Sequence, residues 1–430
     1  MRKRLALIFS LISTAAFGLS AKTPDASALS AAGSFVCSIL TNAPAFDDAA
    51  HFSAAFRAAL THEQLVQILG GVVHEFGSCK RAEVDASEAR FTTDSGFVLQ
   101  GTLVVDATGL ITGLSFMSAE DAQHPVHSWA DLKSAFAQLS GRSAAALVTF
   151  GEPGKVQTFG AAEPMAIGST FKLYVLGALN EAVRSGKLHW GTSLPLRDEW
   201  KSLPGGMMQD LPTTYAPSVF EYAQKMISIS DNTATDHLIH YVGRDAVASM
   251  VHRMGTAAHR GNDPFLTTLE MFKLKWGVSP ATTQAYIDGT PAERNRILDS
   301  LANVPRTDVC RDATACEVPT HIDTIEWFAT PAESCAAMQW LYGNGEPNIR
   351  EILAANTPFI KISADSHWSY AGFKGGSEPG VIATTYVLHA RSGRTGCLSL
   401  AWNDPAHKVS QMRFLGLVKQ ALTLAEQKIN

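Results

Sequence analysis

Basic clusters are missing from the sequence after its first four residues, and charge of either sign is scarce. Charged residues make up 17% of the chain, and the formal net charge is −5. Nucleic-acid binding needs a basic surface, so this balance argues against a nucleic-acid partner. Hydrophobic residues make up 46% of the chain, which is enough for a sizeable core and excludes a disordered protein.

Metal-binding and cofactor motifs are also missing. No C-x-x-C pair occurs, so nothing indicates a zinc ribbon or a thioredoxin-type redox site. His237 and His240 fall on one face of an expected helix, but no third ligand accompanies them, and we expect an ordinary structural role. The sequence therefore implies neither a metal nor an organic cofactor.

The N-terminus combines early basic residues with a short apolar stretch. Met1-Arg-Lys-Arg precedes a short apolar segment, and small residues surround Ala21. This layout is typical of a secretory signal, so we expect residues 1–21 to be removed and the mature protein to be secreted or periplasmic. A membrane anchor is the alternative, but the run is shorter than the about 20 residues of a spanning helix. We expect no membrane partner after cleavage.

The six cysteines are an even number in a chain expected to be exported, which indicates disulfide bonds. Many pairings are possible in principle. The alternative is a set of buried free thiols. We expect the pairs Cys37–Cys79, Cys310–Cys316 and Cys335–Cys397.

The first part of the chain, residues 29–118, has the pattern of a small α+β domain. Helical patterns come first and alternating, strand-like patterns follow, with a turn signal at Asp106-Ala-Thr-Gly109. The polar residues 118–126 are the best linker candidate. The expected helices are 52–60 and 63–76, and the expected strand segments are 82–93 and 96–117.

The second part, residues 128–430, predicts strands at both of its ends and helices between them. Such an order implies one sheet that is assembled from distant segments. The expected helices at its ends are 129–139 and 409–427, and the expected strands are 144–150, 155–159, 359–363, 370–374, 382–390 and 398–402.

Three short motifs in this second part carry chemistry. Ser169 and Lys172 stand at the start of an apolar helix pattern, where positions i and i+3 share a face. Burial and the helix N-terminus would lower the pKa of Lys172 and allow its amine to accept the serine proton. A capped core helix is the alternative interpretation of this motif.

The second motif, Ser230-Asp-Asn232, follows an apolar helix pattern and precedes another. Short polar side chains at such a junction are available to a site, although a plain turn and helix cap also uses these residue types. The third motif, Lys374-Gly375-Gly376-Ser377, lies in a strand pattern. Glycines there indicate close approach by a ligand or a backbone, and an edge strand protected by its lysine is the alternative.

The order and setting of S-x-x-K, S-D-N and K-G-G resemble the motif trio of class A β-lactamases and penicillin-binding proteins. The resemblance covers residues 128–430 and implies a β-lactamase/transpeptidase-like domain, with an antiparallel sheet flanked by helices. The first part more weakly resembles a domain of NTF2 or ketosteroid-isomerase type. Together they resemble two-domain, β-lactamase-fold esterase-like proteins, a group that includes one from clavam biosynthesis.

The resemblance implies a role for each motif residue. Ser169 is the acylated nucleophile and Lys172 its base; Ser230 relays a proton, Asn232 contacts substrate, and Lys374 supports Ser230 and attracts a carboxylate. Gly375, Gly376 and Ser377 line the substrate site. The backbone N–H groups of Ser169 and Ser377 form the oxyanion hole.

Two departures from the family pattern bear on function. Gly375 stands where the family usually has Thr or Ser, which removes a hydroxyl donor to the substrate carboxylate. No E-x-x-x-N motif occurs between Asn232 and Lys374, so the carboxylate that serves deacylation in class A enzymes is not identified. The segment 262–325, with Cys310 and Cys316, makes this interval longer than in compact family members.

These observations favour an exported serine hydrolase that acts through an acyl-Ser169 intermediate on a β-lactam or a related ester or amide. The alternatives are a D-alanyl-D-alanine peptidase or esterase, and a non-catalytic sensor of β-lactams or peptidoglycan fragments. In each case the partner is a small molecule that carries an ester, a β-lactam or a peptide carboxylate. The sequence does not indicate an oligomeric state.

Overall fold

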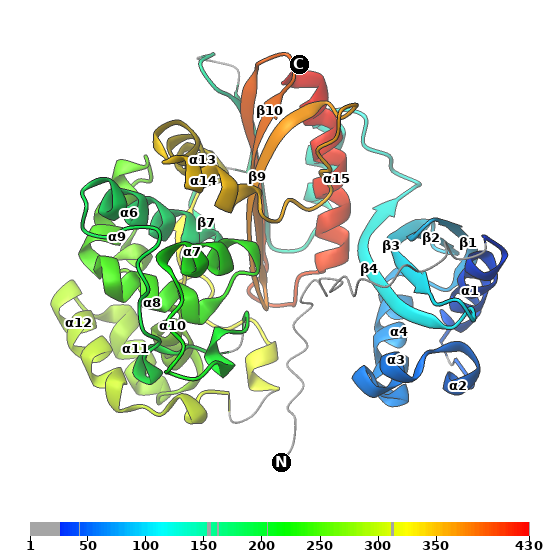
Figure 1. The fold of residues 1–430 in the computed structure, drawn as a ribbon, viewed down its shortest axis with the longest axis horizontal. Coiled ribbons are helices and arrows are strands. Elements are labelled where there is room, and N and C mark those ends of the chain that lie inside the picture. Colours follow the sequence, from blue (N-terminus) through cyan, green and yellow to red (C-terminus); the bar gives the residue numbers. More distant parts are fainter. Residues whose placement is uncertain are drawn as a thin grey trace. The chain divides into compact units, whose positions relative to one another are not determined.

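The computed structural model describes residues 26–42, 44–152, 156–160, 163–203, 205–310 and 314–429. The expected signal peptide lies outside these residues. Within them, no helix combines the length and the apolar character that a bilayer crossing requires. The described chain divides into two compact units, one of residues 26–135 with 410–420, the other of residues 136–409 with 421–429 (Figure 1).

The first unit is an α+β structure, as expected. Its four strands pair in the antiparallel order β1-β2-β3-β4, and a cluster of buried phenylalanine, leucine and valine side chains lies between the helices and the sheet. Asp106 closes the predicted turn by accepting hydrogen bonds from Thr108 and Leu110. The elements are α1 (Ala26–Ile39), α2 (Asp48–His51), α3 (Ala54–Ala59), α4 (His62–Phe76), β1 (Cys79–Asp85), β2 (Glu88–Thr93), β3 (Phe97–Val105) and β4 (Ile111–Asp121).

Three details of this unit differ from the sequence prediction. Helix α1 was not expected, because its alanine- and serine-rich sequence gives a weak periodic signal. The segment 82–93 contains parts of two strands joined by a tight turn that was not predicted, whereas 96–117 is divided at the predicted turn. The proposed linker begins too early, since β4 continues to Asp121 and Ser118 and Ala119 are buried within it.

The second unit contains a five-stranded antiparallel sheet in the order β6-β5-β11-β10-β9 (Figure 1). The prediction of one sheet built from both ends of the domain is therefore confirmed. Strand β9 forms an edge of this sheet, and its partner β10 lies between it and β11. The strands are β5 (Arg142–Thr149), β6 (Val156–Phe159), β9 (Trp368–Glu378), β10 (Val381–Ala390) and β11 (Thr395–Asn403).

The strand expected at 359–363 is wrong. Phe359 has a left-handed backbone with φ of 66°, which interrupts an extended segment. The Arg391 side chain donates to the carbonyl groups of Ser363 and Ser366. These carbonyls therefore have a side-chain partner in place of a neighbouring strand.

Helices fill the middle of this unit, and most of them begin at a capping residue. The segment 262–325 is also helical: Thr267, Ser279 and Thr290 cap its three helices, two of them through complete capping boxes. The helices of this unit are α6 (Lys172–Arg184), α7 (Val219–Ser228), α8 (Asn232–Val242), α9 (Arg244–Arg253), α10 (Thr268–Trp276), α11 (Pro280–Asp288), α12 (Pro291–Ser300), α13 (Pro331–Asn344) and α14 (Pro347–Ala354). Helices α5 (Trp129–Ala137) and α15 (Gln411–Lys428) each contain residues of both units.

A second, two-stranded sheet supports the segment that leads into Ser169. Strand β7 (Met165–Ala166) pairs with β8 (Phe328–Ala329). Asn403, at the end of β11, bonds both backbone groups of Ala166 through its side chain. The nucleophile segment is thus held both by β8 and by the central sheet.

All three expected disulfide bonds are present. Their Cα–Cα distances are 5.2 Å for Cys37–Cys79, 5.7 Å for Cys310–Cys316 and 5.5 Å for Cys335–Cys397. The last of these joins α13 to β11 through two fully buried residues, and it closes the longest loop in sequence, 62 residues.

We expect Cys335→Ala/Cys397→Ala to destabilise the protein more than Cys310→Ala/Cys316→Ala does. Loop-closure entropy predicts losses of about 4 kcal/mol for the long loop and about 2 kcal/mol for the short one. Urea denaturation of the two double variants and the parent protein measures the difference. Equal losses would contradict this ranking.

Candidate active site

The nucleophile segment enters α6 through a short 3-10 turn, Gly168–Phe171. Ser169 is half-exposed in this turn, while Lys172, the first residue of α6, is fully buried. The Lys172 backbone N–H donates to the carbonyl of Ser169. The two residues therefore lie one turn apart, as their spacing predicts.

Two glycines bring strand β9 against this turn. A Cβ atom at Gly376 would lie 2.3 Å from the Ile167 carbonyl oxygen and 2.4 Å from the Ser169 nitrogen. Gly168 has a left-handed φ of 48°, and a Cβ atom there would lie 3.0 Å from the Ser377 nitrogen. Only glycine fits such close backbone approach. The backbone nitrogens of Ser169 and Ser377 are thus brought to the same place.

The buried amine of Lys172 is surrounded by oxygen atoms of the second motif. Its Nζ donates to the Ser230 carbonyl at 2.6 Å, to Asn232 Oδ1 at 2.8 Å and to Ser230 Oγ at 3.1 Å. These three acceptors match the three N–H donors of an ammonium group. Among the described residues, no carboxylate oxygen lies within hydrogen-bonding distance of this amine.

The Ser230 hydroxyl group is hydrogen-bonded to both motif lysines. Its Oγ accepts from Lys172 Nζ and from Lys374 Nζ, each at 3.1 Å. Ser230 itself has a left-handed φ of 59°, which is unusual for a residue with a side chain and is typical of functional sites. This backbone turn directs both the carbonyl and the hydroxyl of Ser230 toward Lys172.

Asp231, between the two polar residues of the motif, has a structural role. One of its oxygens caps α8 by accepting from Ala234 N, and the other accepts from the backbone of Met207 and Met208. The loop before α7 is held further by the bond from Asn232 N to the Gly205 carbonyl at 2.7 Å. The junction is therefore a helix cap, as the alternative interpretation predicted, and at the same time contributes to the lysine cluster.

Burial dominates the electrostatics of the cluster. It lowers the pKa of Lys172 to about 7, and the negative charges of Asp231 and Asp236 oppose part of that shift. Burial, followed by the nearby charge of Lys172, also lowers the pKa of Lys374 well below its ordinary range. The expected lowering at Lys172 therefore has desolvation as its main cause.

Asp236 is a functional candidate that the sequence motifs did not identify. Burial raises the pKa of its carboxyl to about 7, although Thr268 and Leu269 at the start of α10 donate hydrogen bonds to it. It lies one helical turn after Asn232 on α8, and this spacing is the signal that could have revealed it.

The structure brings together the eight predicted site residues: Lys172, Ser230, Asn232 and Lys374 by side-chain hydrogen bonds, Gly375 through its carbonyl, and Gly376 and Ser377 by their approach to the turn that holds Ser169. Among the described residues the Ser169 hydroxyl forms no hydrogen bond. The Gly375 carbonyl accepts from Lys374 Nζ, while a Cβ atom on Gly375 would meet the ring tip of Phe373 at 2.9 Å. The position of the expected family hydroxyl is therefore bordered by an aromatic ring.

The first glutamate after the S-D-N motif is committed to another interaction. Glu270 forms two hydrogen bonds with the Arg244 guanidinium, at 2.6 and 3.0 Å, and accepts from Thr267 N in a capping box. It has no hydrogen bond to Lys172, Ser169 or Ser230. The helical segment that follows S-D-N thus uses this carboxylate for structure.

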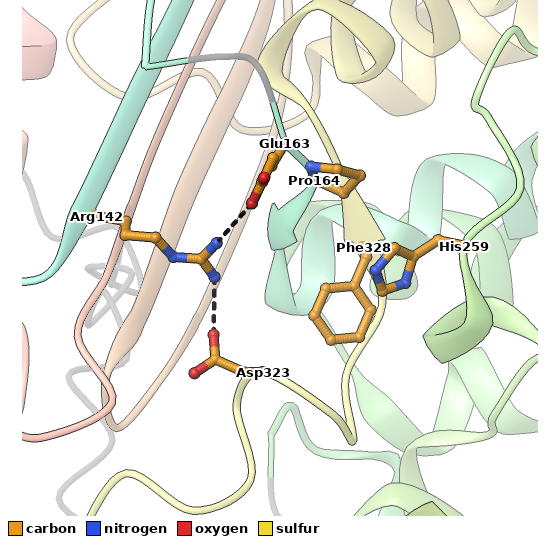
Figure 2. A pocket seen from close by; sticks show the side chains of 6 residues that line it. All are labelled: Arg142, Glu163, Pro164, His259, Asp323 and Phe328. Carbon is orange, nitrogen blue, oxygen red and sulfur yellow. Dashed lines mark hydrogen bonds and ion pairs between the residues drawn. The ribbon is translucent and has the colours of Figure 1, made fainter.

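A surface hollow lies apart from these residues. Figure 2 shows the Arg142 guanidinium between the carboxylates of Glu163 and Asp323, with the His259 ring against Phe328. None of the predicted site residues lines this hollow. Its charged groups pair with one another, so it does not extend the lysine cluster.

Comparison with known proteins supports the resemblance for part of the chain. Residues 129–312 match a family model described as Beta-lactamase2, the Beta-lactamase enzyme family. The match contains Ser169, Lys172, Ser230 and Asn232 and ends before Lys374. The predicted resemblance is confirmed for this segment, which is less than half of the chain. No curated protein matches the sequence significantly.

Solved structures show distant likeness over more of the chain. The β-lactamase from Sphaerobacter thermophilus DSM 20745 has 19% identity and a TM-score of 0.49, over 70% of this chain and 98% of its own. PBP-A has 16% identity and a TM-score of 0.43, over 70% and 98%. The L2 structure complexed with relebactam has 18% identity and a TM-score of 0.47, over 71% and 96%. Likeness at this level carries no information on the reaction.

We expect Gly376→Ala to destabilise the protein by about 1–3 kcal/mol, because its methyl group would overlap two backbone atoms of the nucleophile segment. Gly375→Ala is the matched control on the neighbouring residue, where rotation of the Phe373 ring makes room. We expect its loss to stay within about 0.5 kcal/mol. Thermal denaturation measures both variants, and equal losses would argue against the close contact at Gly376.

Proposed function

We propose that this protein is an exported serine hydrolase of the β-lactamase type, which forms an acyl-enzyme at Ser169. The observation that carries this proposal is the buried Lys172 amine, which lies one helical turn from the half-exposed Ser169. Burial lowers the pKa of this amine to about 7. The expected signal segment and the three disulfide bonds support export. The substrate is a small molecule with a β-lactam, ester or amide carbonyl.

The hydrogen bonds around Lys172 support its role as the base. The Ser230 carbonyl and Asn232 Oδ1 can only accept, so they use the two N–H donors of a neutral amine. The lone pair of that amine is then free to accept a proton. In the proposed step Ser169 Oγ bonds to the substrate carbonyl carbon while its proton moves to Lys172.

The second half of acylation needs a proton at the leaving group. Once Lys172 has taken the Ser169 proton, its third N–H and the Lys374 Nζ both donate to Ser230 Oγ, which leaves the Ser230 hydrogen free to be donated. In the proposed step the bond from the carbonyl carbon to the leaving nitrogen or oxygen breaks, and the Ser230 proton goes to the leaving atom. Lys172 then returns its proton to Ser230, which balances the step.

The carbonyl oxygen acquires negative charge during the attack. The backbone N–H groups of Ser169 and Ser377, brought together by Gly168 and Gly376, are the proposed donors to it. Such donors typically contribute about 10²–10³ in rate. Lys374 adds positive charge to the same site and favours an anionic substrate.

Deacylation is proposed to be slow when the acyl group comes from a β-lactam. Water attack on such an ester needs a base, and the nearest glutamate in sequence after S-D-N is bound to Arg244. This observation favours an esterase or peptidase reaction over efficient β-lactam hydrolysis. A sensor that stays acylated is the remaining alternative.

Mixing the protein with a penicillin or a cephalosporin is expected to add the mass of the drug to the intact protein. Ser169→Ala is expected to abolish the adduct, because the reaction needs the hydroxyl. Mass spectrometry over time measures both formation and loss of the adduct. A persistent adduct supports slow deacylation, and rapid drug loss without one would contradict it. No Ser169-dependent adduct or turnover with β-lactams or ester substrates would overturn the proposed function.

The rate of Ser169 acylation is expected to rise as the pH increases through about 7. The pKa of Lys172 is lowered to about 7 by burial, so its amine is protonated and unable to act as a base below that pH. Stopped-flow rates with a chromogenic cephalosporin measure the profile. In Lys172→Arg the rate is expected to fall at every pH, because guanidinium stays charged. A rate that does not depend on pH between 5 and 9 would exclude Lys172 as the base.

A further inference from the structure

A second buried lysine cluster lies beside the nucleophile segment but contains none of the motif lysines. Lys275, near the end of α10, contacts Glu378 Oε1 at 2.5 Å and Glu326 Oε1 at 3.4 Å. The side chains of Lys275 and Glu326 are fully buried, and that of Glu378 is 9% exposed. Two carboxyl groups thus share one cation out of contact with water.

The first carboxyl group belongs to the strand that carries the proposed oxyanion donor. Glu378 is the last residue of β9 and follows Ser377 directly. Its contact with Lys275 ties the end of this edge strand to α10. A weaker contact between Lys275 and Glu378 would first displace the neighbouring Ser377 backbone, which borders Gly168.

The second carboxyl group belongs to the segment that supports Ser169 from the other side. Glu326 accepts from the Trp327 backbone N–H at 3.2 Å. The Trp327 ring stacks on Phe171 with centroids 3.6 Å apart, and its carbonyl accepts from Ile167 N at 3.0 Å. Lys275 is therefore joined, through the two glutamates, to both backbone segments that form the proposed oxyanion hole.

We propose that Lys275 is a positioning residue for catalysis, which holds the Ser377 backbone N–H against Ser169 by clamping Glu378 and Glu326 together. The clamp rests on the proposed acylation of Ser169, and it acts without touching the substrate. The charges that act on Lys172 are those of Asp231 and Asp236, so the base and the clamp are separate devices.

The proton content of the clamp makes it sensitive to pH. One ammonium group balances one ionised carboxylate, so the second carboxyl group must hold a proton for the buried cluster to be neutral. Burial, followed by the negative charge of Glu326, raises the pKa of Glu378 well above its ordinary range, against the opposing effect of Lys275. At alkaline pH Glu378 ionises beside the negative charge of Glu326, and the repulsion between them weakens the clamp.

Few other charged groups face this cluster. His321 lies close enough for Lys275 to lower its pKa, after the larger effect of its own burial. The Trp276 ring lies 5.6 Å from Lys275 Nζ. On β10, the residue opposite Glu378 is the apolar Val381. The pH response is therefore assigned to Glu378.

The test compares acylation of Lys275→Met, Glu378→Gln and the matched control Glu333→Gln. Glu333 caps α13 in the same unit and takes no part in the clamp. Stopped-flow measurements with a chromogenic cephalosporin from neutral to alkaline pH separate the maximal acylation rate from the concentration dependence. Thermal denaturation confirms that each variant is folded.

We expect Lys275→Met to lower the maximal acylation rate tenfold or more with little change in the concentration dependence. The parent protein is expected to lose acylation rate at alkaline pH. Glu378→Gln, which cannot ionise, is expected to keep its rate there. Deprotonation of Lys374 at alkaline pH would alter substrate binding equally in the parent protein and in Glu378→Gln. It therefore cannot produce a difference between their acylation rates.

Hydrogen exchange gives a readout that does not depend on acylation. The backbone amides of residues 374–378 and of Gly380 are expected to lose protection, measured against the intrinsic exchange rate at the same pH, in Lys275→Met and, at alkaline pH, in the parent protein, but not in Glu378→Gln. Identical pH profiles for the parent and Glu378→Gln, with unchanged exchange in all variants, would overturn the clamp. Absence of acylation in the parent protein, with the exchange pattern as expected, would overturn the proposed function alone.

Discussion

The burial of the Lys172 amine among oxygen acceptors is the constraint on which the rest of the site depends. A cation that leaves water is costly unless it is paired and hydrogen-bonded. Here the Ser230 carbonyl and the Asn232 amide oxygen supply the bonds, and Asp231 and Asp236 supply compensating charge at a distance. The left-handed turn at Ser230 and the polar start of α8 follow from this need. The same burial lowers the pKa of the amine to about 7, so that it can gain or lose a proton near neutral pH.

Much of the site could be predicted from the sequence because its signals are local. Helical spacing places Lys172 one turn after Ser169, and glycines in a strand indicate the close approach of Gly376. The contributions of Asp236 and of the Lys275 cluster could not be found in this way. Their partners come from α10, from the segment before β8 and from β9, and only the tertiary fold brings these together.

The fold, like the site, was predicted where the signal in the sequence is local and was missed elsewhere. The sheet assembled from both ends of the domain was predicted, since its strands have clear apolar patterns. The strand expected at 359–363 was wrong: Phe359 has a left-handed backbone, and the Arg391 side chain satisfies the Ser363 carbonyl. Helices were predicted between the two ends of the domain, but those of 262–325 were not placed individually, although each starts at a capping residue.

Gly375 and Gly376 are adjacent in sequence but have opposite freedom to change. At Gly376 any side chain would overlap the backbone of the nucleophile segment, whereas at Gly375 only the tip of one phenylalanine ring stands in the way. A hydroxyl or a larger group can therefore be introduced at residue 375 without rebuilding the strand. In the proposed mechanism, this single position allows a contact with the substrate to change while the backbone geometry beside it, at Gly376, stays fixed.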